Sequence, residues 1–305
     1  MLKRQEKILE LIQSSQSKEE ITKELKIKDE ILKKDINELT LIGFNITRQF
    51  FYDGTQKYIL KKDIPNQITP ILGIPKDGTF RAIATSDYHI GSNRENLKYV
   101  QKIYDFAKEE DIHIILNGGD LVEGMLNNHI HKSHYEQIEY LLENHPYDSK
   151  ILNFITLGNH DESLIKDTGI DLHTILNTQR DDLVSLGYGI NNIGINKEKI
   201  TMCHIANNLK HINSKLKLTG HGHRYQFKVA YGMPTVFLPT LSNEVKDGYP
   251  PGFVEINIDI KDGFFTKANF ILYTVKQKGF TRVSNSSFNY ENNHPEKTYC
   301  LNKFH

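Results

Sequence analysis

Short β-branched runs that each end in a turn of Gly, Asp, Asn or His constrain the fold of this 305-residue chain most strongly. Residues 112–116 form such a run and lead into the turn NGGD. Residues 151–157 form another and lead into the turn GNHD. An earlier apolar run lies at residues 81–85. Residues 95–109, between that run and the one at 112–116, carry apolar side chains at helical spacing. Alternating strands and helices predict an α/β fold, in which polar side chains collect at the strand ends.

A pair of histidines at the end of a later apolar run indicates a ligand site. His221 and His223 lie in the segment LTGHGHR. Residues i and i+2 of an extended segment point the same way, so the two imidazoles can face one point.

The strand ends together offer carboxylate, amide and imidazole groups but no thiolate. The candidate ligands are Asp87, His89, Asp120, Asn159, His204, His221 and His223. This donor set suits manganese, iron or zinc at a catalytic site better than structural zinc. Seven donors exceed the need of one ion, and paired ions about 3.5–4 Å apart are a common device for hydrolysing phosphate esters. We therefore expect two divalent metal ions, with manganese as the first choice.

The same blocks resemble the motif series of the calcineurin-like metallophosphoesterases, D-x-H, G-D, G-N-H-[DE], H and G-H-x-H, over residues 80–275. The resemblance implies a four-layer α/β/β/α sandwich, with two mixed sheets packed face to face and helices outside. It also implies ligand roles. The first metal would be held by Asp87, His89 and His223, the second by Asn159, His204 and His221, and Asp120 would bridge the two.

The resemblance further implies a reaction. A hydroxide between the two ions would attack phosphorus in line, while the ions neutralise the phosphoryl oxygens. His160 is not a ligand in the family and is the candidate proton donor to the leaving oxygen. Asp161, next to it, is expected to orient the His160 ring.

Residues 1–62 show three helical patterns followed by a hairpin pattern. Apolar spacing predicts helices over residues 4–14, 18–25 and 28–42, and Asp53-Gly54 predicts a hairpin turn. This order resembles the winged helix-turn-helix domains, which implies contacts with DNA. The candidate phosphate contacts are Lys33, Lys34, Arg48 and Lys57. Acidic residues on the third helix oppose such contacts, so a small docking or dimerisation module is the alternative.

Other segments indicate how the chain is organised. Residues 63–79 are rich in Pro and Gly and read as a linker, and residues 276–305 read as a polar, weakly structured extension. Basic and acidic residues both number 38, so any nucleic-acid site must be local. Without an apolar signal region or membrane-spanning stretch, we expect a cytoplasmic protein with no membrane partner.

Some polar side chains between the motif blocks are weaker candidates for substrate binding or metal ligation. His131 and His134 follow the second block and are predicted to line the substrate cleft, with a solvated loop as the alternative. Arg180 is predicted to clamp a phosphate, with an exposed charge as the alternative. His211 competes with His204 as a ligand, but His204 is preferred because it ends an apolar strand.

These patterns lead to a functional hypothesis. The chain is expected to be a two-metal phosphodiesterase, a nuclease that a winged helix brings to DNA. The phosphoesterase-like region at residues 80–275 and the winged-helix-like region at residues 1–62 together resemble phosphoesterases encoded by phages and low-GC bacteria. One alternative is a phosphomonoesterase or small-nucleotide phosphodiesterase whose N-terminal module serves docking or oligomerisation. Another is a DNA-binding regulator with a phosphoesterase domain that only senses a ligand.

Overall fold

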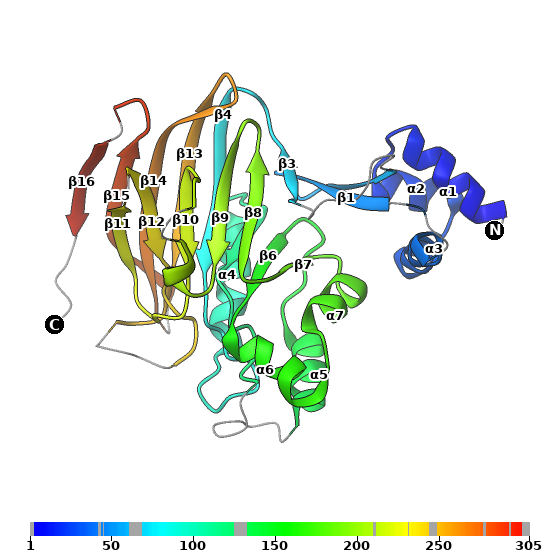
Figure 1. Cartoon of the computed structure of the whole chain (residues 1–305), viewed down its shortest axis with the longest axis horizontal. Coiled ribbons are helices and arrows are strands. Elements are labelled where there is room, and N and C mark those ends of the chain that lie inside the picture. The colour runs from blue at the N-terminus through cyan, green and yellow to red at the C-terminus, as the bar shows by residue number, and fades with distance from the viewer. Residues whose placement is uncertain are drawn as a thin grey trace.

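The computed structural model describes residues 3–41, 44, 46–60, 69–124, 133–209, 212–230, 232–243, 249–276, 279–292 and 294–300. These residues form a mixed α/β fold with two sheets and seven α-helices (Figure 1). Most strands stack at one end of the elongated molecule, and the first three helices lie at the other.

The first sheet has eight strands in the order β16-β15-β14-β13-β4-β5-β6-β7. Its parallel half is β4 (Gly78–Thr85), β5 (Ile114–Asn117), β6 (Leu152–Leu157) and β7 (Leu183–Tyr188). Its antiparallel half is β13 (Gly252–Lys261), β14 (Phe264–Lys276), β15 (Gly279–Asn289) and β16 (His294–Cys300). Every residue of β5 and β6 is buried, as expected for central strands covered on both faces.

The second sheet also has eight strands, in the order β11-β12-β10-β9-β8-β3-β1-β2. Its larger part is β8 (Ile190–Ile195), β9 (Glu198–Cys203), β10 (Leu216–Thr219), β11 (Gln226–Ala230) and β12 (Met233–Phe237). Its remaining strands are β1 (Ile46–Phe51), β2 (Gln56–Leu60) and β3 (Ile71–Gly73). The β1–β2 hairpin therefore extends this sheet, because β3 pairs in parallel with both β1 and β8.

The two sheets share one apolar core. Alternate residues Phe80, Ala82 and Ala84 of β4 point into it, as the period of a strand requires. Leu216 and Leu218 of β10 meet them from the second sheet. The predicted face-to-face packing of two mixed sheets is thus formed.

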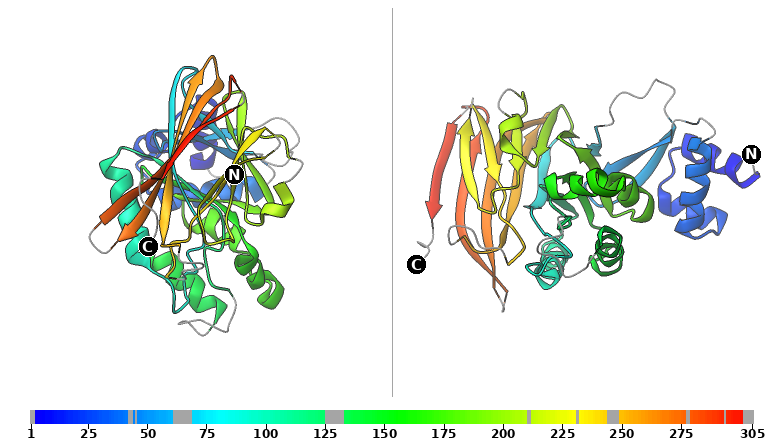
Figure 2. Two further views of the ribbon diagram at one scale, coloured as in Figure 1. Left: turned by 90° about the vertical axis from the view of Figure 1, so that its left-hand side faces the viewer. Right: turned by 60° about the horizontal axis from the view of Figure 1, so that its bottom comes forward.

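Four helices cover the other face of the first sheet (Figure 2). They are α4 (Leu97–Glu109), α5 (His134–Asn144), α6 (Asn159–Thr168) and α7 (Leu172–Gln179). The predicted outer helical layer on the second sheet is not found among the described residues. Lys217 on β10 instead donates to the carbonyl of Leu209, so the 3-10 turn η1 (Ala206–Leu209) lies against this face at β10.

The N-terminal module consists of α1 (Lys3–Gln13), α2 (Lys18–Leu25), α3 (Asp29–Leu41) and the β1–β2 hairpin. The three helices lie close to their predicted bounds. A capping box precedes α2, because Ser17 Oγ accepts from the Glu20 amide and the Glu20 carboxylate accepts from the Ser17 amide. The module has a separate apolar core that includes Ile8, Ile21 and Leu39.

Two expectations about the connecting segments are wrong in part. Residues 71–73, assigned to a linker, form β3 because Leu72 is fully buried in the inter-sheet core. Residues 279–289 and 294–300, expected to be weakly structured, form β15 and β16. Buried Val283 and Phe288 anchor β15 among its Ser and Asn residues, so polar composition hid a strand. No helix of the described residues is long and apolar enough to cross a membrane.

Candidate metal centre

The seven predicted ligands lie on loops that follow strands of both sheets. In the first sheet, Thr85 pairs with Asn117, which pairs with Ile155, so β4, β5 and β6 end at one level. In the second sheet, β9 and β10 run in parallel and end together. The two sets of loops touch, since the amide of His221 donates to Asp87 Oδ2 at 3.1 Å. One edge of the sandwich thus gathers residues that are far apart in sequence.

The backbone at this edge is held in an unusual conformation. Five of the seven predicted ligands have a positive φ, namely Asp87 at 54°, His89 at 48°, Asp120 at 52°, His221 at 64° and His223 at 53°. Left-handed backbone at residues other than glycine costs about 1–3 kcal/mol each and clusters at functional sites. The loops are therefore shaped to aim these side chains, at a cost in stability.

Glycine is required where two of these loops touch. A Cβ on Gly158 would lie 2.1 Å from Asp120 Oδ1 and 2.7 Å from the Asp120 amide nitrogen. Any side chain at this position would displace Asp120. The glycine of the GNHD turn thus permits the close approach in which the His160 amide donates to Asp120 Oδ1 at 2.9 Å.

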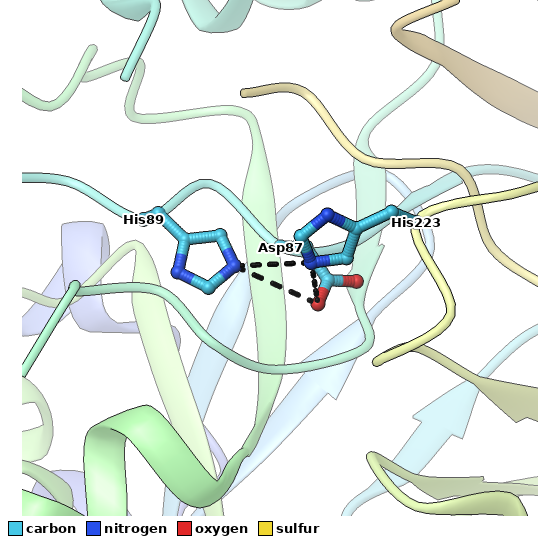
Figure 3. A group of neighbouring side chains, drawn as sticks. All are labelled: Asp87, His89 and His223. Carbon is cyan, nitrogen blue, oxygen red and sulfur yellow. Dashed lines mark hydrogen bonds and ion pairs between the residues drawn. The ribbon is translucent and has the colours of Figure 1, made fainter. Parts of the chain in front are cut away.

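Asp87, His89 and His223 form a first group of convergent donors (Figure 3). The Nε2 atoms of the two histidines are 3.2 Å apart. Asp87 Oδ1 is 3.2 Å from His223 Nε2 and 3.9 Å from His89 Nε2. Ligand atoms about 2.1 Å from one ion lie roughly 3–3.5 Å from each other, so this spacing suits a shared cation.

Asp120, His204 and His221 form a second group. His204 Nε2 is 2.9 Å from Asp120 Oδ2, while its Nδ1 is 2.8 Å from the carbonyl of Gly118, which orients the ring. His204 Nε2 is also 4.0 Å from Asp87 Oδ1, so the two groups adjoin. Burial disfavours the charged imidazole, but the adjacent Asp120 carboxylate raises the pKa of His204 to about 9. The carboxylates of this centre thus favour positive charge.

The donor atoms fit a metal because many of them are buried without a hydrogen bond. Among the described residues, Asp87 Oδ1, Asn159 Oδ1 and His204 Nε2 have no hydrogen-bond partner in spite of full burial. Buried polar atoms are normally satisfied, and an unsatisfied one costs about 1–3 kcal/mol. His204 Nε2 approaches Asp120 closely but lacks hydrogen-bond geometry, as expected when both atoms point at a common ion. Six of the seven predicted ligands therefore lie in two adjoining groups whose donors are chemically suited to divalent cations, while the role of Asn159 stays a prediction.

A comparison with protein families decides the identity of this domain. The family model described as calcineurin-like phosphoesterase matches residues 80–243. The chain belongs to this family. It is therefore a metal-dependent phosphoesterase, a hydrolase that acts on phosphate esters.

Solved structures were also compared with the phosphoesterase. Vacuolar protein sorting 29 from Cryptosporidium parvum is 14% identical, with 68% of this chain and 97% of that chain covered and a TM-score of 0.43. The phosphoesterase Yfce from E. coli is 13% identical, with 73% and 100% covered and a TM-score of 0.41. An archaeal phosphodiesterase is 14% identical, with 61% and 96% covered and a TM-score of 0.40. None of the curated proteins matches the chain.

Glu123 is a residue of the phosphoesterase centre that no sequence motif predicted. Its carboxylate Oε2 lies 3.1 Å from His89 Nδ1, and its carbonyl lies 2.6 Å from His160 Nδ1. The His160 ring meets the His89 ring edge to face, with centroids 4.6 Å apart. Glu123 thus orients both a predicted ligand and the predicted acid. The only signal in sequence is its place three residues after Asp120 in the same loop.

Asp161 does not have the contacts predicted for it. Its carboxylate accepts backbone N–H groups of Leu121, Val122 and Gly158, at 2.8–3.2 Å. Burial and the nearby charge of Asp120 raise the pKa of Asp161 to about 6, although these amides oppose the shift. Because its carboxylate accepts these backbone amides, Asp161 connects the loop after β5 to the start of α6. The His160 ring is oriented by Glu123 instead.

The weaker loop candidates lie apart from the ligand groups. His134 is buried at the start of α5, with Nε2 3.4 Å from Asp167 Oδ2. Arg180 pairs with Asp182 and donates to the carbonyls of Leu142, His145 and Pro146. The predicted phosphate clamp is therefore corrected to a structural contact, since these acceptors occupy the guanidinium. His131 and His211 lie outside the described residues.

The four cations predicted to meet DNA have different surroundings. Lys33 Nζ is 2.9 Å from Asp181 Oδ1, and Arg48 donates to the Asp181 carbonyl and to Asn177. Lys57 lies over the ring of Phe51, and Lys34 is exposed on α3. Lys33 and Arg48 thus face the phosphoesterase domain, away from the metal centre.

Proposed function

We propose that the chain is a two-metal phosphodiesterase that cleaves nucleic acid, with DNA as its substrate. The observation that carries the proposal is the pair of adjoining donor groups around Asp87 and Asp120, with donor atoms buried and unsatisfied. Asp120 belongs to the second group, which adjoins Asp87 through His204, and its two carboxylate oxygens make it the ligand suited to bridge two ions. Carboxylate, amide and imidazole donors favour manganese, with iron or zinc as alternatives.

When bound, the ions would supply a water-derived nucleophile and neutralise charge on the phosphoryl oxygens. The chain supplies the other parts of the reaction. His160 Nδ1 is engaged by the Glu123 carbonyl, which leaves Nε2 to give a proton to the leaving oxygen. Its side chain is 20% exposed, so a substrate can reach it. Glu123 fixes the ring before the substrate arrives.

The N-terminal module supports the nucleic-acid part of the proposal. Three helices and a hairpin in this order suit a winged helix-turn-helix, with exposed Lys34 on the third helix. In this role α3 would contact DNA phosphates, and the module would hold the substrate near the metal centre. The zero net charge of the chain makes such a local cationic surface necessary.

One observation favours a second candidate function. Lys33 and Arg48, on the expected DNA-contacting face, bind the phosphoesterase domain instead. A module fixed in this way can be a docking part of an enzyme for phosphomonoesters or small nucleotides. In that case exposed Lys34 would have no role in turnover.

The test compares substrates with and without metal. Metal-stripped protein receives Mn²⁺ and is assayed on single-stranded DNA, duplex DNA, RNA and bis(p-nitrophenyl) phosphate. His160→Gln is the test variant and His113→Gln its control, because both side chains are 20% exposed and His113 lies outside the donor groups. We expect Mn²⁺-dependent DNA cleavage that falls by about a hundredfold or more in His160→Gln only. Hydrolysis of the small diester alone would reject the nuclease and favour the second candidate.

A further inference from the structure

A cavity of about 610 Å³ lies between the N-terminal module and the phosphoesterase domain. Its walls come from α3, β1 and β2 on one side and from α7, β7 and β8 on the other. None of its lining residues belongs to the donor groups of the metal centre. Its volume is within the range of about 300–1,000 Å³ that is typical of small-molecule sites. The polar lining residues used below are Lys33, Arg48, His173, Asn177, Asp181 and Ser185.

The charges at this cavity leave an excess of one cation. Asp181 accepts from Lys18 at 2.7 Å and from Lys33 at 2.9 Å, and Lys18 also pairs with Asp29 at 2.7 Å. Lys33, Arg48 and Asp181 line the cavity, which leaves one excess cation there, and the pair of Lys18 and Asp29 outside the lining does not change that balance.

The excess charge is on Arg48. Its guanidinium donates to the Asp181 carbonyl at 3.3 Å and to Asn177 Oδ1 at 3.1 Å, and it stacks over the ring of Phe50. Within the described part of the chain, no carboxylate lies within ion-pair distance of this half-buried guanidinium. Burying an unpaired cation is costly, and the planar fork of arginine matches a phosphate group.

Neutral polar groups of the cavity complete the pattern. His173 Nδ1 is 3.0 Å from Ser185 Oγ, and Asn177 lies next to both residues. Gln56, which is not one of the lining residues, donates to the same Asp181 carbonyl as Arg48, while its Oε1 is buried without a hydrogen-bond partner among the described residues. Imidazole, amide and hydroxyl groups of this kind recognise hydrogen-bonding ligands.

We propose that this cavity binds a small phosphate-bearing molecule with the chemistry of a nucleoside monophosphate. Arg48 binds the phosphate, and the polar groups of α7 and β7 bind the rest of the ligand. Since the walls belong to both parts of the chain, the ligand stabilises the docked position of the module. The site is separate from the metal centre and does not depend on the substrate proposed above.

The test locates and measures AMP binding to the full-length, Mn²⁺-loaded protein. An azido derivative of AMP is photo-crosslinked and the modified peptides are mapped, because AMP can also occupy the metal centre. We expect crosslinks in residues 46–58 or 173–191 that inorganic phosphate suppresses. Calorimetry should show that Arg48→Gln weakens this binding by about tenfold or more. Arg282→Gln, an exposed arginine on β15, is the matched control and should change nothing.

A second variant keeps the proposal testable if Arg48→Gln fails to fold. Thr178 is an exposed lining residue whose hydroxyl bonds only to carbonyls of its own helix among the described residues. Thr178→Trp should obstruct the cavity and weaken AMP binding by about tenfold, without change in hydrolysis of the small diester. Crosslinks confined to the metal centre, or unchanged AMP affinity in Thr178→Trp, would overturn the proposal. Binding of an oligonucleotide but not AMP at Arg48 would overturn it in favour of a nucleic-acid surface.

Discussion

The metal centre and the contact around Asp181 are both buried clusters of charged side chains, but they differ in how their polar atoms are satisfied. At the metal centre, several carboxylate, amide and imidazole atoms are buried without a hydrogen bond among the described residues. At Asp181, both carboxylate oxygens have a lysine partner at 2.7–2.9 Å. Buried polar atoms without partners indicate that a ligand is missing, whereas a buried carboxylate whose two oxygens are both paired indicates a structural contact. A substitution at the metal centre should therefore lower activity and leave stability almost unchanged, whereas a substitution at Asp181 should lower stability.

The largest effect is expected from Asp120→Asn. The amide retains the size of the side chain and can still accept from the His160 amide, but it removes the charge suited to bridge two ions. Mn²⁺-dependent hydrolysis of the small diester should fall on the order of a thousandfold. The unfolding free energy of the metal-stripped protein should change by less than about 1 kcal/mol. Activity within tenfold of the wild type would show that Asp120 is not essential to the centre.

Asp181→Ala is expected to act in the opposite way. The substitution removes the carboxylate that Lys18 and Lys33 share and leaves buried Lys18 with the more exposed Asp29 alone. The loss of one member of a buried ion pair costs about 3 kcal/mol. Denaturant unfolding should measure this loss. Asp105→Asn, on the exposed face of α4, is the control and should stay within about 0.5 kcal/mol. Equal stability of the two variants would mean that Asp181 does not join the two parts.

His145 tests a third kind of buried polar group, one that is neutral. Burial lowers the pKa of His145 to about 4, with Asp182 opposing the shift. Because the unfolded chain takes up a proton near pH 6.5, folding should lose up to about 3 kcal/mol as pH falls from 7 to 4. His145→Phe cannot titrate, so its unfolding free energy should fall less over this window. Parallel pH curves for the two proteins would contradict the assignment.

The smallest effect is expected from Glu123→Gln. This positioning residue contacts His89 and His160 but belongs to neither predicted ligand set. Residues that orient metal ligands typically contribute ten- to a hundredfold, so Mn²⁺ affinity should fall by about that factor. Glu139→Gln, exposed on α5, is the control. Unchanged Mn²⁺ affinity would show that the Glu123 carboxylate does not position His89, since the variant keeps the backbone carbonyl that contacts His160.

The parts of the molecule that were predictable depend on local patterns. Strand periodicity placed Asp87, Asp120 and His204 at strand ends. The expectation that His221 and His223 face one point along an extended segment is wrong, because both follow β10 with left-handed backbone and belong to different donor groups. The family resemblance supplied the two facing sheets, but the outer helical layer on the second sheet is replaced by η1.

The parts that could not be predicted depend on contacts between distant residues. Lys18 and Asp181 are 163 positions apart, and neither has a local signal of its partner. Glu123 and Asp161 are near the motifs, yet only the folded backbone shows which of them faces His160. Strand β15 was hidden because its buried Val283 and Phe288 are separated by Ser and Asn residues.

The central claim is that the unsatisfied donors at the sandwich edge hold two divalent ions. Titration of Mn²⁺ into the metal-stripped full-length chain, followed by calorimetry and elemental analysis, tests it most directly. The account predicts about two Mn²⁺ per chain, with one site weakened in His89→Ala and both weakened in Asp120→Asn. Binding of one ion or none, or unchanged stoichiometry and affinity in Asp120→Asn, would contradict it.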